Sequence, residues 1–487
     1  MREILLIISI LLPIAGGISL QIIRPSSDRA QRFRCELTAI LTSILVWALI
    51  LGGTMKPFTV YSFTLGFRIL FQVDGLGMLF AAMVSIMWPF VTLYAFEYME
   101  SEQRTTWFFA FYIMTYGVTL GVCFAGNVLT LYVFYEMLSL VTIPLVCYYQ
   151  NRESMYAGRV YAGYVIGGAA AALIPVMVTT LYEPTAFVLG GHRFDYLPPQ
   201  FVLLMFVIGF FGFGVKAAVM PLHAWLPTAS VAPTPVTALL HAVAVVNTGV
   251  FAIMRLTWYV FSPTILHGTW AQYVTLGAAI VTLLVSACRA LRERHFKRRL
   301  AYSTVSNLSY MLYGVMLLNP DGFVAGMAHM LFHGVIKMSL FLCAGAFMHQ
   351  SGHSYVYEIN GAGRKMRFTF AFYTVGALSL SGIPLLCGFI SKWRLLIAGA
   401  VEGTALSYIG EACLLTAAFF CALYTLSVSV RAYFPVRENN IWKDSSLKDP
   451  GWRMLLPIGF FTAVNILLGV IPGPVLDFLG RIASGTV

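Results

Sequence analysis

The chain has 487 residues, of which 59% are hydrophobic and only 10% are charged. Since soluble domains average about a quarter charged residues, this composition excludes an ordinary soluble protein and predicts a polytopic membrane protein. The net charge of +11 does not indicate nucleic-acid binding, because the basic residues stand in short blocks between long apolar runs, as in loops that fix membrane topology.

Fourteen apolar runs are long enough to cross a hydrocarbon layer of about 30 Å, which needs roughly 20 residues in a helix. The first run lacks a cleavage site of small residues before its basic loop, so we expect a retained helix rather than a signal peptide. The predicted spans are residues 3–21, 37–54, 71–95, 106–125, 128–149, 160–182, 200–220, 235–259, 270–289, 300–318, 322–348, 368–400, 405–430 and 453–471.

Lysine and arginine are concentrated in alternate loops, and the positive-inside rule assigns those loops to the cytoplasm. With an even number of spans, both termini are expected outside the cytoplasm. No loop is long enough to form a separate soluble domain. The predicted cytoplasmic loops are residues 22–36, 97–105, 150–159, 289–299, 349–367 and 431–452.

Two segments depart from plain membrane helices. The first, GFFGFGVKAAVMPLHAWLPTASVAPTP, carries Lys216 just before a series of prolines, and the second, GALSLSGIPLLCGFISKWRLL, carries Lys392 after a Gly-Ile-Pro sequence. Proline removes a backbone donor that lipid cannot replace, so such breaks persist only when buried in protein or lining a hydrated cavity. Corresponding breaks in two halves of a chain predict an inverted-repeat transporter with half-helices near the midplane.

Seven ionisable residues inside the predicted spans are the candidates for function, because a charge there costs at least ~2.5–3.5 kcal/mol on insertion scales and therefore needs a reason. Three of them, in the sequence HMLFHGVIKMSLFL, are four residues apart and share one helix face. Asp74, near a helix start, is a weaker candidate. The seven are Glu136, Lys216, His241, His329, His333, Lys337 and Lys392.

Proton relay is the chemistry that fits all seven. Burial lowers the pKa of a lysine and a nearby carboxylate raises it, so a buried lysine with a movable carboxylate partner can bind and release a proton. Histidine titrates near neutrality and can pass a proton between its two ring nitrogens. The histidine and lysine ladder, together with water, therefore predicts a lateral path for protons.

Other interpretations of the same residues stay open at this point. Glu136 and Lys216 could form a structural ion pair, and His241 could be a core histidine bonded to a carbonyl. The histidine ladder could bind zinc, although no H-E-x-x-H pattern accompanies it. Lys392 could extend from a helix end toward the membrane surface.

The eight cysteines are scattered singly without a C-x-x-C pair, which argues against disulfides and iron–sulfur ligation. The sequence also lacks ATP-binding and dinucleotide-binding motifs. We therefore expect no cofactor and no metal in this chain, and any redox chemistry in another polypeptide.

Four motifs are long and specific: VKAAVMPLHAWLPTASVAPTPVTALLHAVAVV, RRLAYSTVSNLSYM, HMLFHGVIKMSLFL and GIPLLCGFISKW. Together they resemble the antiporter-like subunits of respiratory complex I, of Mrp-type cation/proton antiporters and of membrane-bound energy-converting hydrogenases. The resemblance extends from about Asp74 to Lys392 and so covers most of the chain.

The resemblance implies an all-α polytopic membrane fold of about 14 transmembrane helices, with broken helices 7 and 12. Its implied divisions are N-terminal helices in residues 1–105, two inverted five-helix repeats in residues 106–259 and 270–430, and a cytoplasmic loop with the last helix in residues 431–487.

The resemblance also implies roles for individual residues in proton translocation. Matched by position, the coupling pair of the fifth and seventh helices is Glu136 and Lys216, the eighth-helix histidine is His241, the eleventh-helix relay is His329, His333 and Lys337, the twelfth-helix terminal lysine is Lys392, and the lysine preceding the LAYST motif is Lys297.

The sequence departs from the family pattern in two places. Asn247 stands where many relatives have a lysine, which leaves His241 to serve alone or with water. The chain ends at Val487 without the long lateral helix of the largest complex I subunit, which argues against that subunit. The segment LLHAVAVV favours hydrogenase-type complexes.

We therefore expect a proton-translocating subunit, itself without redox chemistry, of a multisubunit redox-driven pump in the plasma membrane of a prokaryote. The pump would be an energy-converting hydrogenase or a complex I relative. The expected partners are other membrane subunits, including a neighbouring antiporter-like or quinone-site-like subunit, and peripheral iron–sulfur or hydrogenase subunits. One alternative is a subunit of a Mrp-type Na+/H+ antiporter without redox chemistry, and another is a structural anchor whose charges hold helices together.

Overall fold

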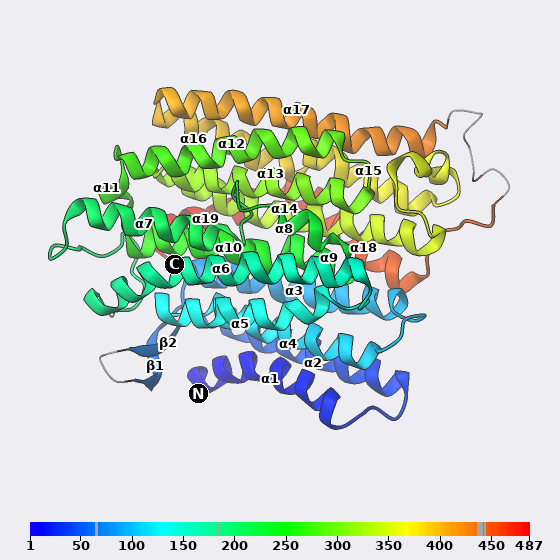
Figure 1. The fold of residues 1–487 in the computed structure, drawn as a ribbon, viewed down its shortest axis with the longest axis horizontal. Coiled ribbons are helices and arrows are strands. Elements are labelled where there is room, and N and C mark those ends of the chain that lie inside the picture. The colour runs from blue at the N-terminus through cyan, green and yellow to red at the C-terminus, as the bar shows by residue number, and fades with distance from the viewer. Residues whose placement is uncertain (64–66, 184, 436–441, 443–444) are drawn as a thin grey trace.

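A computed structural model describes residues 1–63, 67–183, 185–435, 442 and 445–487. Its long helices lie side by side along one direction and form a single bundle (Figure 1). The N and C termini lie at the same end of the bundle, near the strands β1 and β2 (Figure 1). This arrangement agrees with an even number of crossings, while the orientation relative to the cytoplasm stays a prediction.

The described chain is almost entirely helical, as its composition predicts, because backbone polar groups in lipid must be satisfied within each spanning element. The long and short helices are α1 (Arg2–Ile22), α2 (Asp28–Leu51), α3 (Gly75–Tyr98), α4 (Thr105–Cys123), α5 (Val128–Val146), α6 (Arg152–Tyr182), α7 (Pro199–Gly214), α8 (Trp225–Thr228), η2 (Ala229–Val231), α9 (Thr234–Ala242), α10 (Val245–Arg255), η3 (Leu256–Val260), α11 (Pro263–Leu266), α12 (Trp270–Arg292), α13 (Phe296–Met316), α14 (Pro320–Ser351), η4 (Val356–Ile359), η5 (Ala362–Arg364), α15 (Arg367–Ser381), α16 (Cys387–Glu402), α17 (Ala405–Tyr433), α18 (Trp452–Val470) and α19 (Gly473–Ser484).

Within the described residues, 11 helices are long and apolar enough to cross a membrane. The other predicted spans fall on helices that are short, interrupted or more polar. Residues 200–220 coincide with α7, residues 300–318 with α13, and residues 368–400 with α15 and α16 together. The count of 14 crossings and the two inverted repeats stay predictions.

Two helices begin earlier than their predicted spans, because polar side chains cap them inside the predicted loops. α2 begins at Asp28, where the Ser27 side chain accepts a hydrogen bond from the Ala30 nitrogen. α6 begins at Arg152, where the Asn151 side chain accepts from the Ser154 nitrogen at 2.8 Å. Capping of this kind satisfies the free donors of the first helical turn.

An antiparallel hairpin of β1 (Met55–Ser62) and β2 (Arg68–Val73) is a feature that the all-α prediction missed. Residues 71–73, predicted as the start of a helix, belong to β2. Aromatic and β-branched residues alternate there and favour an extended strand. The helix α3 begins only after Asp74, whose carboxylate accepts from the Gly77 nitrogen at 2.9 Å.

Helix α14 is a long helix that other helices enclose over most of its length. It packs against α9, α13, α15, α16 and α18, and nearly all of its residues are buried. The polar side chains of α14 therefore face protein rather than lipid. This position explains how one helix can keep two histidines and a lysine inside a membrane protein.

The helical path breaks at both predicted places and at a third. α7 ends at Gly214, and the next helix starts at Trp225. α15 ends at Ser381, and α16 starts at Cys387. The third break separates α9 from α10 inside the predicted span 235–259, and no proline marks it.

Candidate functional site

Lys216 lies in the break that follows α7 and is fully buried. Its ammonium group donates to the main-chain carbonyl of Tyr135 in α5 and lies 3.5 Å from the centre of the Tyr135 ring. Gly249 of α10 lies against the main chain of this segment, since a Cβ atom there would lie 2.4 Å from the main-chain nitrogen of Ala217. Helix α10 therefore packs directly against the segment that holds the lysine.

The carbonyls freed near this break are bound by neighbouring side chains. The indole nitrogen of Trp225 donates to the Val215 carbonyl at 2.7 Å. The Tyr135 hydroxyl donates to the Phe213 carbonyl at 3.2 Å. These bonds meet the condition that irregular backbone at membrane depth must be satisfied by protein or water.

Glu136 follows Tyr135 on α5 and is half-buried. Its carboxylate accepts a hydrogen bond from the Ser139 hydroxyl at 3.2 Å. It interacts electrostatically with Lys216, but these two side chains form no ion pair among the contacts of the described residues. The lysine thus binds the main-chain carbonyl of Tyr135, the residue next to Glu136, rather than the Glu136 carboxylate.

His241 lies near the end of α9 and is fully buried. Neither ring nitrogen has a hydrogen-bond partner among the described residues, and the ring stacks on Phe341 of α14 with centroids 4.8 Å apart. A core histidine bonded to a carbonyl, one of the interpretations left open by the sequence, is therefore not what this conformation contains.

Asn247 explains the break between α9 and α10. Its side-chain amide donates to the Ala242 carbonyl at 2.7 Å, a group that the broken helix leaves free. Its carbonyl oxygen has no partner among the described residues. Asn247 therefore caps the helix end adjacent to His241.

His329 and His333 occupy successive turns of α14 but differ in their surroundings. The ring of His329 contacts the Ser391 hydroxyl at 2.9 Å through Nδ1 and the Asn307 side-chain oxygen at 3.2 Å through Nε2. His333 has no hydrogen-bond partner at either nitrogen among the described residues. The two ring centroids lie 6.1 Å apart.

The remaining buried lysines all donate to main-chain carbonyls, as Lys216 does. Lys392 is 6% exposed, which contradicts the interpretation that it extends to the membrane surface. In these bonds Lys337 contacts the carbonyl of Leu300 at 2.9 Å and also the Ser303 hydroxyl, Lys392 contacts the carbonyl of Leu380 at 2.5 Å, and Lys297 contacts the carbonyl of Ala232 at 2.9 Å.

The structure thus brings the candidates together in two groups. One is the pair Glu136 and Lys216 around Tyr135. The other surrounds α14, where His333 interacts electrostatically with Lys337, His329, His241 and Lys392. Helix α10 joins the groups, because Gly249 contacts the Lys216 segment and Asn247 binds the helix end beside His241.

Metal binding finds little support in this arrangement. In the part of the chain that the structure describes, no three His, Cys, Asp or Glu side chains come together as a set that could hold a metal ion. The nitrogens of His329 already contact a hydroxyl and an amide. The zinc interpretation of the histidine ladder is therefore set aside.

A buried ion pair between Asp74 and Arg255 was not predicted from the sequence. Two guanidinium nitrogens of Arg255 donate to the two carboxylate oxygens of Asp74, one of them at 2.6 Å. The guanidinium is fully buried beside aromatic rings, including that of Tyr259 at 4.6 Å. The signal in the sequence is an arginine inside an apolar run, whereas Asp74 by itself indicates only a helix start.

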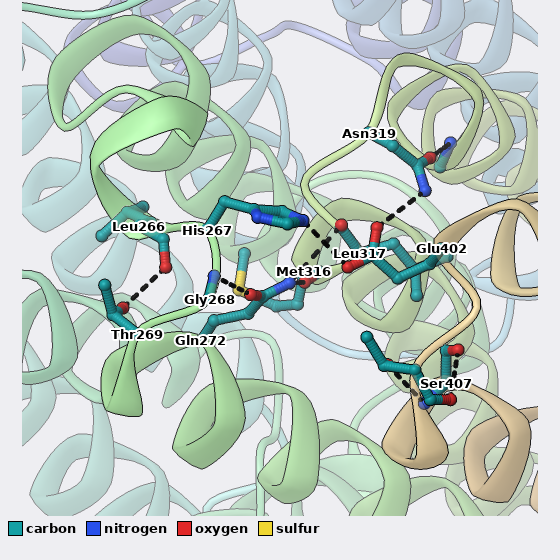
Figure 2. A network of polar contacts seen from close by, with 12 residues as sticks. Leu266, His267, Gly268, Thr269, Gln272, Met316, Leu317, Asn319, Glu402 and Ser407 are labelled. Atoms are coloured by element: carbon teal, nitrogen blue, oxygen red, sulfur yellow. Dashed lines mark hydrogen bonds and ion pairs between the residues drawn. The ribbon is translucent and has the colours of Figure 1, made fainter.

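A polar network ties several helix ends together (Figure 2). The carboxylate of Glu402, at the end of α16, contacts the His267 ring at 3.0 Å and accepts from the Asn319 amide at 3.3 Å. Asn319 also caps α14 by accepting from the Gly322 nitrogen at 2.7 Å. Gln272 of α12 donates to the Met316 carbonyl at 3.2 Å. The network fixes the ends of the helices that carry the histidines and Lys392.

Residues 125–428 match the family described as NADH:quinone oxidoreductase/Mrp antiporter, TM. One relative, from Rhizobium meliloti and named as part of a probable K(+)/H(+) antiporter, is 30% identical over 488 aligned residues, which cover 96% of this chain and 47% of that protein. Another, from the Na(+)/H(+) antiporter of Alkalihalophilus pseudofirmus, is 31% identical over 368 residues, or 70% of this chain and 44% of that protein. The chain spans about half the length of the curated relatives it matches.

Solved structures share the fold over almost the whole chain. A chain of the archaeal membrane-bound sulfane sulfur reductase has a TM-score of 0.86 at 21% identity and covers 99% of this chain and 97% of its own. A chain of the Mrp complex from Dietzia has a TM-score of 0.85 at 20% identity, with coverage of 100% and 97%. A chain of respiratory complex I from Thermus thermophilus has a TM-score of 0.83 at 23% identity, with coverage of 99% and 98%.

Proposed function

Because the chain belongs to the NADH:quinone oxidoreductase/Mrp antiporter transmembrane family, we propose that it carries protons across the membrane as an antiporter-like component of a multisubunit pump. The observation that supports this proposal is the set of buried lysines and histidines around α14 and the α7 break. Each buried charge is costly in a membrane, and these lysines contact carbonyls rather than carboxylates. Packing alone would be served better by apolar side chains.

The two groups of residues have different tasks in this mechanism. Glu136 and Lys216 form the coupling pair, in which the lysine exchanges its carbonyl partner at Tyr135 for the neighbouring carboxylate. A proton leaves the pair when the two charges separate and returns when they approach. Movement of a charge in a neighbouring subunit shifts the pair between the separated and the close state.

Protons cross the second group along α14. His241 and His333 have free ring nitrogens and pass protons through water, whereas His329 is held in place by its contacts with Ser391 and Asn307. Lys337 stands one turn beyond His333, and Lys392 is the terminal site. The proposed roles of these residues are those that the family resemblance implies.

The proposed driving force is electron transfer in partner subunits of an energy-converting hydrogenase or complex I relative. Iron–sulfur or hydrogenase subunits and a neighbouring antiporter-like or quinone-site-like subunit would be its partners. The fold is shared equally with a chain of a respiratory sulfur reductase and with a chain of a Mrp complex, so it is compatible with this choice and with the alternative. The second candidate is a Mrp-type Na+/H+ antiporter without redox chemistry, which the names of the two sequence relatives favour.

The proposed location is the plasma membrane of a prokaryote, with both termini outside the cytoplasm. The proposed internal organisation is two inverted repeats in residues 106–259 and 270–430. The breaks after α7 and after α15, each with a buried lysine beside it, support that division.

Two experiments test the proposal. Purification from native membranes in mild detergent, with mass spectrometry of the proteins that accompany the chain, separates the candidates: iron–sulfur or nickel–iron subunits support the redox pump, and only small membrane subunits support the antiporter. In the intact complex, Glu136→Ala and Lys216→Ala should each abolish ion pumping while assembly persists. Normal pumping by both variants would refute the coupling pair.

A further inference from the structure

A cavity of ≈ 560 Å³ opens at the end of the bundle opposite the two termini, outside the relay. It lies between the end of α1, the start of α4 and the turn that joins α5 to α6. Its lining includes Gln21, Arg24, Arg104, Trp107 and Gln150. The loops that meet there are among those assigned to the cytoplasm by their basic residues.

The charge in this cavity is positive and uncompensated by its own lining. No acidic residue lines it among the described residues. Arg104 donates to the side-chain oxygen of Gln150, and Arg24 makes no hydrogen bond or ion pair within the described part of the chain. The nearby Glu100 is already paired with Arg32 at 3.0 Å. A guanidinium group with free donors matches the geometry of a phosphate group, and two of them line this cavity.

The cavity lies at the ends of predicted membrane helices, where lipid headgroups are expected. Trp107 is of the residue type that favours the boundary between water and hydrocarbon. Beside the cavity, Ile22 and Ile23 at the end of α1 are 76% and 64% exposed. Exposed apolar side chains continue along α1 at Ile18 and Leu11. A ligand with a phosphate at one end and hydrocarbon at the other would satisfy both surfaces.

We propose that this cavity binds the phosphate of an anionic phospholipid, with the acyl chains lying along the exposed face of α1. The two arginines hold the phosphate, and Gln21 and Gln150 offer hydrogen bonds to the rest of the headgroup. The site would anchor the first helices in the leaflet that carries the basic loops, independently of proton transport.

Native mass spectrometry of the full chain, released from nanodiscs, tests this proposal with phosphatidylglycerol as the probe. Each arginine that holds the phosphate at the site adds about fivefold to the affinity for an anionic lipid. We expect about a fivefold loss of phosphatidylglycerol affinity for Arg24→Gln and about 25-fold for Arg24→Gln with Arg104→Gln. Arg292→Gln, an exposed arginine outside the cavity, is the matched control and should bind as wild type does.

Two further arms distinguish the source of the phosphate. Phosphatidylcholine should not be retained at the site, and millimolar inorganic phosphate should not displace phosphatidylglycerol. The single variant Arg24→Gln alters an exposed side chain, so its helical content should match wild type. Retention of phosphatidylglycerol by the double variant, an equal loss in the control, equal retention of phosphatidylcholine, or displacement by inorganic phosphate would each overturn the proposal.

Discussion

Replacing Lys216 with methionine separates a transport role from a structural one, because the two roles predict different effects on stability. Lys216 is fully buried, and its hydrogen bond goes to the Tyr135 carbonyl rather than to a carboxylate. Burial of the charge costs about 2.5–3.5 kcal/mol, and a hydrogen bond from a charged group returns about 1.5–3 kcal/mol. Methionine avoids the cost of burying the charge but loses the hydrogen bond, so the net change in the free energy of unfolding is close to zero.

A structural tether would behave differently. Breaking a buried ion pair by removing one partner costs about 3–5 kcal/mol, since the remaining charge is left uncompensated. We therefore expect Lys216→Met to unfold within about 2 °C of wild type while proton pumping by the intact complex is lost. Glu136→Gln should give the same pattern.

The assays are thermal unfolding of the purified protein and proton uptake by vesicles that contain the assembled complex. Lys56→Met in the exposed hairpin is the control and should change neither. A fall of many degrees in the unfolding temperature of Lys216→Met, with pumping preserved per folded molecule, would refute the reasoning and favour the anchor.

Three further predictions concern the relay and its surroundings. His333→Leu should leave stability unchanged and impair proton transfer, because His333 has no hydrogen-bond partner among the described residues. His329→Leu should lose about 1–3 kcal/mol of unfolding free energy, because the buried side-chain oxygen of Asn307 loses its partner and Ser391 loses one of its two contacts. Equal unfolding temperatures of the two variants would contradict this contrast. Gly249→Ala should destabilise the protein and reduce pumping, because its Cβ would press on Ala217, whereas the control Gly163→Ala, with nothing within 4 Å, should be tolerated. Thermal unfolding and proton uptake compare the two variants. An unaffected Gly249→Ala would disprove the close approach of α10 to Ala217. Burial, aided by Lys297 and Arg298, lowers the pKa of His295 from 6.5 to about 4. The unfolded chain therefore binds the proton at a higher pH than the folded chain, and stability should fall as the pH drops from about 6.5 to 4. His295→Asn, which can still cap α13, should flatten this pH dependence in thermal unfolding at several pH values, and an unchanged dependence would exclude His295 as its source.

Membrane helices were predictable because lipid imposes one rule on every residue of a span. Hydropathy alone located most spans, and the two proline-marked breaks fall where the sequence placed them. The break between α9 and α10 could not be found this way, because Asn247 produces it through a side-chain bond to a carbonyl rather than through a missing donor. The hairpin was missed for a related reason, since short apolar strands and apolar helix starts have similar composition.

The site residues were predictable as types but not as partners. An ionisable residue inside an apolar run is visible in the sequence, whereas the group that its head contacts depends on which helix ends lie nearby. The main-chain carbonyls of three apolar residues bind Lys337, Lys392 and Lys297, and an apolar side chain does not indicate that role in the sequence. These residues are Leu300, Leu380 and Ala232. Arg255 was missed because its partner, Asp74, is distant in sequence.

The three buried histidines differ in their hydrogen-bond partners. Buried polar groups nearly always have partners, so the unpartnered rings of His241 and His333 require water or a second side-chain position. His329, by contrast, is held between Ser391 and Asn307. A family lysine at position 247 would have placed a fixed charge beside His241. Asn247 instead binds the Ala242 carbonyl and adds no charge, so in the proposed relay a proton passing between Lys216 and His333 would depend on water at the α9–α10 break.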